Sequence, residues 1–140
     1  MKRWLVTVAV LAVAAASAGC ARGVAAESLA PGDRTIELRV RHSRFSPSRV
    51  SVPEGTTVRF VVHNDDPIPH ELIVGDDDVH LRHEQGTEAW HPPRPGEVSV
   101  AAGALASTTF TFTATGETEF ACHLPGHYAY GMKGVVTVSQ

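Results

Sequence analysis

The stretch ACHLPGHYAYGM, residues 121–132, decides the fold of this chain. It carries a thiol at Cys122, an imidazole at His127 and a thioether at Met132, with four residues between each of these side chains and the next. A Pro-Gly pair inside the stretch predicts a turn, and Phe120 and Cys122 fall on one face of a predicted strand. We therefore expect a loop at a strand end that brings sulfur and nitrogen ligands together.

These side chains suggest a metal site of a particular kind. A thiolate, imidazoles and a weak axial thioether form the ligand set of a blue copper electron-transfer site. A second imidazole must come from elsewhere, and His70 lies between two strand-like segments, directly after Pro69. If the two segments converge, the protein binds one copper ion that alternates between Cu(I) and Cu(II) and passes single electrons.

The number of cysteines supports this interpretation. The chain has two, Cys20 and Cys122, and Cys20 belongs to a predicted export signal. Cys122 is then the only thiol of the folded part, so an internal disulfide is excluded. Exported proteins meet oxidising conditions, in which an exposed lone thiol would oxidise or cross-link. Cys122 is therefore expected to be buried and inert or occupied by metal, and its neighbours favour metal.

The N-terminal segment predicts export. Two basic residues precede an apolar run that is too short for a transmembrane helix, and small residues then lead to Cys20. This ending resembles a bacterial lipobox, in which Cys20 would be lipidated and become the new N-terminus. Ordinary signal cleavage near Ala18 or Ala26 is the alternative. The expected divisions are a signal peptide at 1–19, a flexible tether at 20–34 and one domain at 35–140.

The rest of the chain predicts an all-β domain. Apolar and polar residues alternate along it, as at Val58, Phe60 and Val62, and such alternation indicates strands with one buried face. Gly, Pro and Asp residues punctuate the runs. We expect a Greek-key β-sandwich or barrel of about eight strands, with a long loop at 76–95 that contains one helical turn near 81–86. The predicted strands are 35–41, 48–52, 56–63, 70–75, 97–101, 105–113, 118–122 and 133–138.

At this point the chain resembles the cupredoxin family, the plastocyanin- and azurin-like blue copper proteins. The motifs that carry the resemblance are FSP at 45–47, VPEGTTVRF at 52–60, Asn64, PHEL at 69–72, the 122–132 loop and KGVVTV at 133–138. The resemblance implies that His70, Cys122 and His127 are equatorial copper ligands and that Met132 is the axial ligand. It also implies that His127 is the partly exposed electron port, flanked by Pro125, Gly126 and Tyr128.

Two positions depart from the family pattern. Plastocyanin carries Asn directly after the first His ligand, where it pins the Cys loop, and this chain has Glu71. His123 follows Cys122, whereas in multicopper oxidases His residues on both sides of that Cys reach a second copper cluster. Ala121 precedes Cys122 here, so half of that arrangement is missing. The dinuclear centre of cytochrome oxidase subunit II needs a second Cys where this chain has Gly126.

The remaining histidines have weaker patterns. His123 is expected to be a surface or hydrogen-bonding residue, and His42 and His63 to lie at strand ends or face outward. An accessory Cu(II) or Zn(II) site could be built from His80, His83, His91, Asp76, Asp77, Asp78, Glu84 and Glu88. Their spacing matches no firm ligand motif, so a solvated polar loop is the expectation. The aspartate run is a docking patch for a basic redox partner or simply part of that loop.

We therefore expect a monomeric one-electron carrier, not an enzyme, that works outside the cytoplasmic membrane with redox partner proteins. It would be either a lipoprotein on the outer face of that membrane or a periplasmic or secreted protein. The formal net charge of −3 gives no reason to expect nucleic acid, which needs a basic face. The alternative is a copper-binding protein that buffers or delivers the metal. A nitrite reductase or oxidase fragment is disfavoured because no second complete ligand set is found, and a metal-free sandwich leaves the lone thiol unexplained.

Overall fold

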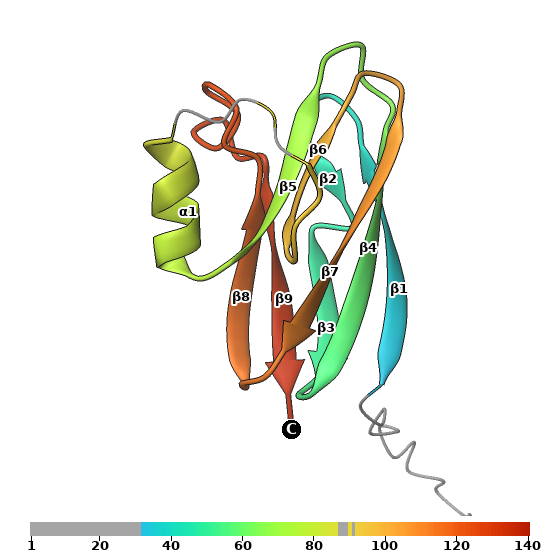
Figure 1. The fold of residues 1–140 in the computed structure, drawn as a ribbon, viewed down its shortest axis with the longest axis vertical. Coiled ribbons are helices and arrows are strands. Elements are labelled where there is room, and N and C mark those ends of the chain that lie inside the picture. The colour runs from blue at the N-terminus through green and yellow to red at the C-terminus, as the bar shows by residue number, and fades with distance from the viewer. Residues whose placement is uncertain (1–31, 87–89, 91) are drawn as a thin grey trace, which may run out of the picture.

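Two facing β-sheets form the domain (Figure 1). The computed structural model describes residues 32–86, 90 and 92–140. Its strands are β1 (Asp33–Val40), β2 (Phe45–Ser46), β3 (Arg49–Pro53), β4 (Thr56–Asn64), β5 (His70–Gly75), β6 (Glu97–Val100), β7 (Leu105–Phe112), β8 (Gly116–Ala121) and β9 (Lys133–Ser139). The predicted all-β sandwich is confirmed, and β2 is a short strand that was absent from the predicted ranges, although it falls in the FSP motif of the resemblance.

The strand order places the ligand loop at one end of the second sheet. The first sheet has the order β2-β1-β4-β7 and the second the order β3-β9-β8-β5-β6. β8 and β9 are antiparallel neighbours, with Ala121 opposite Lys133 and Phe120 opposite Gly134. Cys122 and Met132 therefore leave the sheet side by side. β5 pairs with β8 on its other edge, which brings the N-terminal end of β5 to the same region.

Aromatic side chains fill the space between the sheets. Phe60 and Phe112 of the first sheet and Phe120 of the second are fully or almost fully buried. The Phe120 ring lies 5.4 Å from the ring of Phe45 and 6.5 Å from that of Phe60, centroid to centroid. Alternate residues of β4 point into this core, as the period-two pattern predicted. The core therefore extends to within two residues of Cys122.

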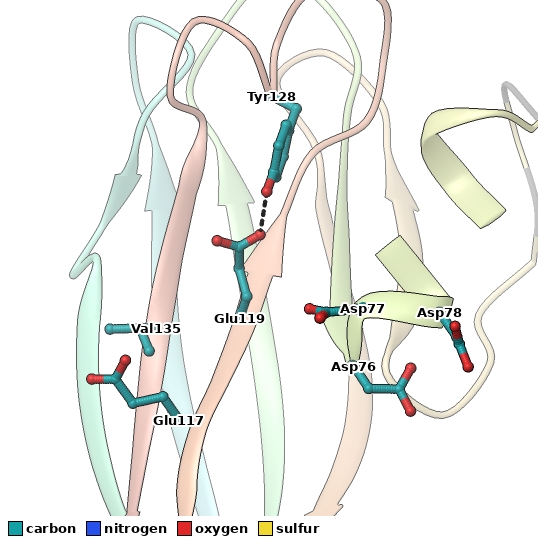
Figure 2. Close-up of a pocket in the computed structure, with 8 residues that line it drawn as sticks. Asp76, Asp77, Asp78, Glu117, Glu119, Tyr128 and Val135 are labelled. Carbon is teal, nitrogen blue, oxygen red and sulfur yellow. Dashed lines mark hydrogen bonds between the residues drawn. The ribbon is translucent and has the colours of Figure 1, made fainter. Parts of the chain in front are cut away.

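The segment expected to be a loop contains a helix. α1 spans Asp77–Glu84, two turns that begin four residues before the predicted helical turn. Asp76 is its N-cap, and the Asp76 carboxylate accepts a hydrogen bond of 3.0 Å from the N–H of Val79. Asp77 and Asp78 lie in the first turn, where negative charge favours a helix. The aspartate run is therefore a helix start rather than a solvated loop, and Figure 2 shows it beside β8.

The predicted divisions of the N-terminal region mostly lie outside the described residues. These include the signal peptide, Cys20 and most of the tether. β1 begins at Asp33, two residues before the predicted start of the domain. In the part of the chain that the structure describes, no helix is long and apolar enough to span a membrane.

Gly134 provides a test of how tightly β8 and β9 pack beside the ligand loop. A Cβ at this position would lie 2.3 Å from the Phe120 ring and 2.5 Å from the carbonyl oxygen of Ser48. We expect Gly134→Ala to lower the free energy of unfolding of the metal-free protein by about 1–3 kcal/mol, the usual cost of overpacking. Chemical denaturation measures it.

Gly103→Asn is the matched control. Gly103 has φ +66 and open space around its Cβ position, and Asn tolerates this conformation. Its effect should stay within about 0.5 kcal/mol. Equal stability of Gly134→Ala and the native protein would contradict the packing described here.

Candidate metal centre

Three of the predicted ligands converge at one end of the sandwich. His70 is the first residue of β5, Cys122 follows β8, and His127 lies in the loop between β8 and β9. One potential ligand atom from each lies within 4.8 Å of the other two. The Cys122 sulfur is 3.3 Å from Nδ1 of His127, and the His70 and His127 ring centroids are 4.9 Å apart. The structure thus brings together two segments more than fifty positions apart in sequence.

Backbone hydrogen bonds close the loop that carries the other ligands. The N–H of Cys122 donates to the carbonyl of Met132 over 3.1 Å, and the N–H of Met132 donates to the carbonyl of His127 over 2.9 Å. Gly126 and Gly131 both have φ +85, the left-handed conformation that favours glycine. The Met132 side chain is completely buried. Its axial ligation stays a prediction.

Burial determines the protonation state of the Cys122 thiol in the metal-free protein. Burial raises the pKa of Cys122 to about 12, although the backbone N–H groups of Glu71 and Leu124 act in the opposite direction. Without metal the sulfur is therefore protonated at neutral pH and shielded from oxidants, since the thiolate is the reactive form. A metal ion that binds here must displace this proton, because the thiolate is also the ligand.

The His70 ring is oriented for metal binding. Its Nε2 lies 3.0 Å from a carboxylate oxygen of Asp66, which can only accept, so Nε2 carries the proton. Its Nδ1 is buried and has no hydrogen-bond partner among the described residues. Burial lowers the pKa of His70, with Asp66 opposing the effect, so the ring offers a neutral lone pair. A histidine that donates its other N–H to a carboxylate is typical of metal sites.

Asp66 was not identified from the sequence, where it was interpreted as part of a turn. Its carboxylate also accepts hydrogen bonds from the backbone N–H groups of His42 and Ser43, of 2.7 and 2.8 Å. Both residues have positive φ, 53° and 52°, which aims their N–H groups at the carboxylate. Burial alone would raise the pKa of Asp66, but these bonds and His70 lower it, so the group stays ionised.

Asn64 fixes the segment that presents His70. Its side-chain amide donates to the carbonyls of Ile68 and Ala101, over 2.8 and 2.9 Å. Its side-chain oxygen accepts the N–H of Asp66 over 3.0 Å. These bonds attach the turn before β5 to β4 and to the segment after β6. They therefore fix the position of the backbone from which the His70 side chain extends.

Glu71 performs the pinning that the family pattern assigns to Asn. Its side-chain Oε1 accepts a hydrogen bond of 2.7 Å from the backbone N–H of His123, directly after Cys122. Glu71 is only 2 % exposed, so this bond is protected from water. The departure from the family pattern therefore keeps the Cys loop attached to β5, with a carboxylate in place of an amide.

His127 lies at the surface end of the site. The residue is half-buried, while Pro125 and Gly126 beside it are exposed. Tyr128 faces the other way: its ring stacks on His123 at a centroid distance of 4.8 Å, and its hydroxyl donates to Glu119 over 2.8 Å (Figure 2). Tyr128 thus belongs to the far side of the loop rather than to the surface around His127.

His123 is the hydrogen-bonding residue that was one of the two expectations from the sequence, since its Nε2 lies 2.9 Å from Nδ1 of His80. It lies against two histidines of α1, His80 and His83. Burial and these two neighbours lower the pKa of His123 to about 4, so its ring is neutral. The expectation of a solvated loop is therefore wrong for His80, which is buried. His91 and Glu88, also proposed as accessory ligands, lie outside the described residues.

The other histidines have local partners. His63 Nε2 contacts a carboxylate oxygen of Glu37, on the neighbouring strand β1. His42 contributes its backbone N–H to Asp66. Neither side chain joins the group formed by His70, Cys122 and His127.

The donor set fits copper. A thiolate favours Cu(I), and imidazole suits both Cu(I) and Cu(II). The observation that supports the fit is that Nδ1 of His70 is buried without a hydrogen-bond partner among the described residues, in a ring that belongs to the converging group with Cys122 and His127. His70, Cys122 and His127 would hold the ion.

Similarity to known proteins agrees with this geometry. The sequence matches the family of copper binding proteins described as the plastocyanin/azurin family, over residues 35–139. It is 39 % identical to the copper-resistant cuproprotein CopI of Rubrivivax gelatinosus, over 77 % of this chain and 71 % of that protein. It is 31 % identical to CopI of Pseudomonas aeruginosa, over 96 % and 93 %.

A further relative has a solved structure. Auracyanin-B of Chloroflexus aurantiacus is 32 % identical over 76 % of this chain and 52 % of that protein. The structure of auracyanin B superposes with a TM-score of 0.62 at 30 % identity, covering 76 % of this chain and 89 % of that one. With the site geometry, these similarities establish that this chain is a copper protein of the plastocyanin/azurin family, a cupredoxin.

Proposed function

We propose that this protein is a mononuclear type 1 copper protein that carries single electrons outside the cytoplasmic membrane, and that it is not an enzyme. The observation that carries the proposal is the buried convergence of the Cys122 sulfur with the rings of His70 and His127. Such a ligand set supplies a Cu(I)/Cu(II) couple when copper is bound. The proposed export and the proposed contact with redox partner proteins are based on the sequence.

The role of the chain is to keep the ligands in place during electron transfer. The Cys122–Met132 backbone bond closes the loop, Glu71 holds the peptide after Cys122, and Asp66 holds the His70 ring. Each restraint is buried or partly buried, so water competes little for it. Ligands that move little on oxidation and reduction keep the reorganisation energy small, which suits a carrier.

The end of the molecule around His127 suits contact with a redox partner. His127 is the most accessible of the three converging ligands, since His70 and Cys122 are buried. Two apolar side chains close in sequence to converging residues are exposed: Ile68, two residues before His70, is 42 % exposed, and Tyr130, three residues after His127, is 76 % exposed. Apolar contact with a rim of polar groups is typical of such interfaces. We place electron entry and exit at His127.

The second candidate function is copper handling. Two relatives are named copper-resistant cuproproteins, which favours a role in buffering or delivering copper. The two functions differ in how the Cys122 site releases metal. A carrier retains its copper through many oxidation cycles, whereas a delivery protein must give it up readily.

Copper loading tests the type 1 site. Addition of Cu(II) to the metal-free protein should produce an intense visible absorption from thiolate-to-copper charge transfer, which a mild reductant bleaches and an oxidant restores. Cys122→Ser should lose this absorption entirely, because the hydroxyl cannot replace the thiolate. A colourless native adduct, or an unchanged band in the variant, would contradict the proposal.

Asp66 should tune the reduction potential. Its carboxylate makes the His70 ring a stronger donor, which favours Cu(II). We expect Asp66→Asn to raise the potential by tens of millivolts, where about 59 mV is a tenfold change in the relative affinity for the two oxidation states. Voltammetry measures it.

Asp65→Asn provides the control for Asp66. Asp65 is adjacent but forms surface ion pairs with Arg39 and Arg41. Its removal should leave the potential nearly unchanged, since exposed charges are well screened. An equal shift in both variants would show that the His70 hydrogen bond is not the cause.

Metal release separates the two candidate functions. In a carrier, an excess of Cu(I) chelator should remove the copper of the Cys122 site slowly, because the ligand loop is pinned by Glu71 and by its own backbone bonds. Electron exchange with a soluble redox dye should be fast by comparison. Release within the mixing time, with slow electron exchange, would favour copper handling instead.

A further inference from the structure

The helix α1 contributes one buried residue to the domain, and that residue is polar. His80 is the buried residue of α1, which lies beside β8 (Figure 1). The stabilisation that a helix gains from packing is roughly proportional to the apolar area that it buries. A helix whose buried residue is a histidine adds little to the apolar core. We therefore looked at what the His80 side chain contacts.

His80 belongs to a closed network of contacts with Glu119, His123 and Tyr128, here called the Glu119 network. Nε2 of His80 lies 3.2 Å from the backbone carbonyl oxygen of Glu119, and Nδ1 of His80 lies 2.9 Å from Nε2 of His123. The His123 ring stacks on the Tyr128 ring, with a centroid distance of 4.8 Å and an interplanar angle of 19°. The Tyr128 hydroxyl donates to the Glu119 carboxylate over 2.8 Å, which closes the network.

One arrangement of protons satisfies both hydrogen bonds of His80. A carbonyl oxygen can only accept, so Nε2 of His80 carries a proton, and Nδ1 of the neutral ring is an acceptor. Nε2 of His123 is then the donor to His80. Nδ1 of His123 has no hydrogen-bond partner among the described residues, so the bond to His80 is the only one that the His123 ring makes there. The orientation of this ring therefore depends on His80 and on the Tyr128 stack.

His123 connects the Glu119 network to the copper centre. It is joined to Cys122 by a peptide bond, and its backbone N–H donates to Glu71. We propose that His80 is a positioning residue of the copper centre, which holds residues 122–128 through His123 and slows the loss of copper. This inference rests on the proposed function of the Cys122 site. It adds a restraint from α1 to those from Glu71 and from the backbone bonds of the loop.

Contacts that do not involve His80 hold α1 against the second sheet. Arg82 forms an ion pair of 2.6 Å with Glu97 of β6, whose side chain is largely buried. Val79 packs closely on Gly75 at the end of β5, where an added Cβ would lie 2.8 Å from Cβ of Val79. α1 is therefore a fixed support. Loss of the His80 side chain should free the ligand loop without detaching the helix.

Opening of the ligand loop must break the bond between His80 and His123 before copper can leave with its ligands exposed. The net contribution of one hydrogen bond corresponds to a factor of about two to ten in a rate. The His80 side chain makes two such bonds within the Glu119 network. We therefore expect its removal to accelerate copper release at least threefold.

Release of copper from the loaded protein tests this role. The reduced protein is mixed with an excess of a Cu(I) chelator, and the rate of copper transfer is measured. His80→Leu cannot form hydrogen bonds and should release copper at least threefold faster than the native protein. The thiolate-to-copper absorption of the oxidised variant reports that its site is intact. His80→Gln should restore the native rate, because its amide can donate to Glu119 and accept from His123.

A second variant tests whether the effect passes through His123. His123→Phe keeps the aromatic stack on Tyr128 and the backbone bond to Glu71 but cannot bond to His80. It should also accelerate release at least threefold, and it decides the question if His80→Leu does not fold. The double variant His80→Leu/His123→Phe should release copper no faster than the faster single variant, because both changes remove the same contact.

Val52→Ala is the control for a general loss of stability. Val52 is buried and pairs with Val138, near the end of β9 that is remote from the ligand loop. The cavity left by this substitution lowers the stability of the fold, but the rate of copper release should stay within twofold of the native rate.

Four results would overturn the role of His80. They are an acceleration below threefold in His80→Leu, equal rates in His80→Gln and His80→Leu, multiplied effects in the double variant, and equal acceleration by Val52→Ala. Absence of the thiolate-to-copper absorption from the native protein would instead refute the proposed type 1 site.

Discussion

The hydrogen bond from the N–H of Cys122 to the carbonyl of Met132 is the constraint on which the copper centre depends. It extends the pairing of β8 with β9 by one step beyond the sheet, so the sulfur leaves a rigid edge rather than a free loop. The glycines at 126 and 131 then allow the loop to fold back within ten residues. The pairing of β8 with β9 therefore fixes the positions of Cys122 and Met132. The aromatic core a few residues away holds this sheet in place.

Carboxylates perform much of the positioning around this centre. Asp66 orients the first histidine, and Glu71 holds the peptide that follows the sulfur. Glu97 lies against His83 of α1. Each of these side chains is largely buried, where an acidic group persists only with nearby donors. Asp66 and Glu71 therefore position His70 and the cysteine loop without belonging to the converging group themselves.

The sequence predicted most of the fold and the three converging residues. The alternation around Phe60 is strong because one face of β4 is buried, and the spacing from Cys122 to His127 needs only a local turn. β2 has two residues, too few to show a period. α1 has no apolar stripe, since His80 is its buried residue, so its polar sequence suggested a loop. The Asp66 contacts depend on a turn more than twenty positions away, which no local pattern encodes.

β5 begins with His70 followed by Glu71, and neighbouring side chains of a strand point to opposite faces. His70 faces the sulfur of Cys122, while Glu71 reaches the amide after it. Because side chains alternate along a strand, these two neighbouring residues take different roles: His70 joins the converging group, and Glu71 holds the loop that carries Cys122. A slip of β5 by one residue would send a carboxylate to the position of the imidazole, so the register of this strand specifies the metal preference of the whole domain.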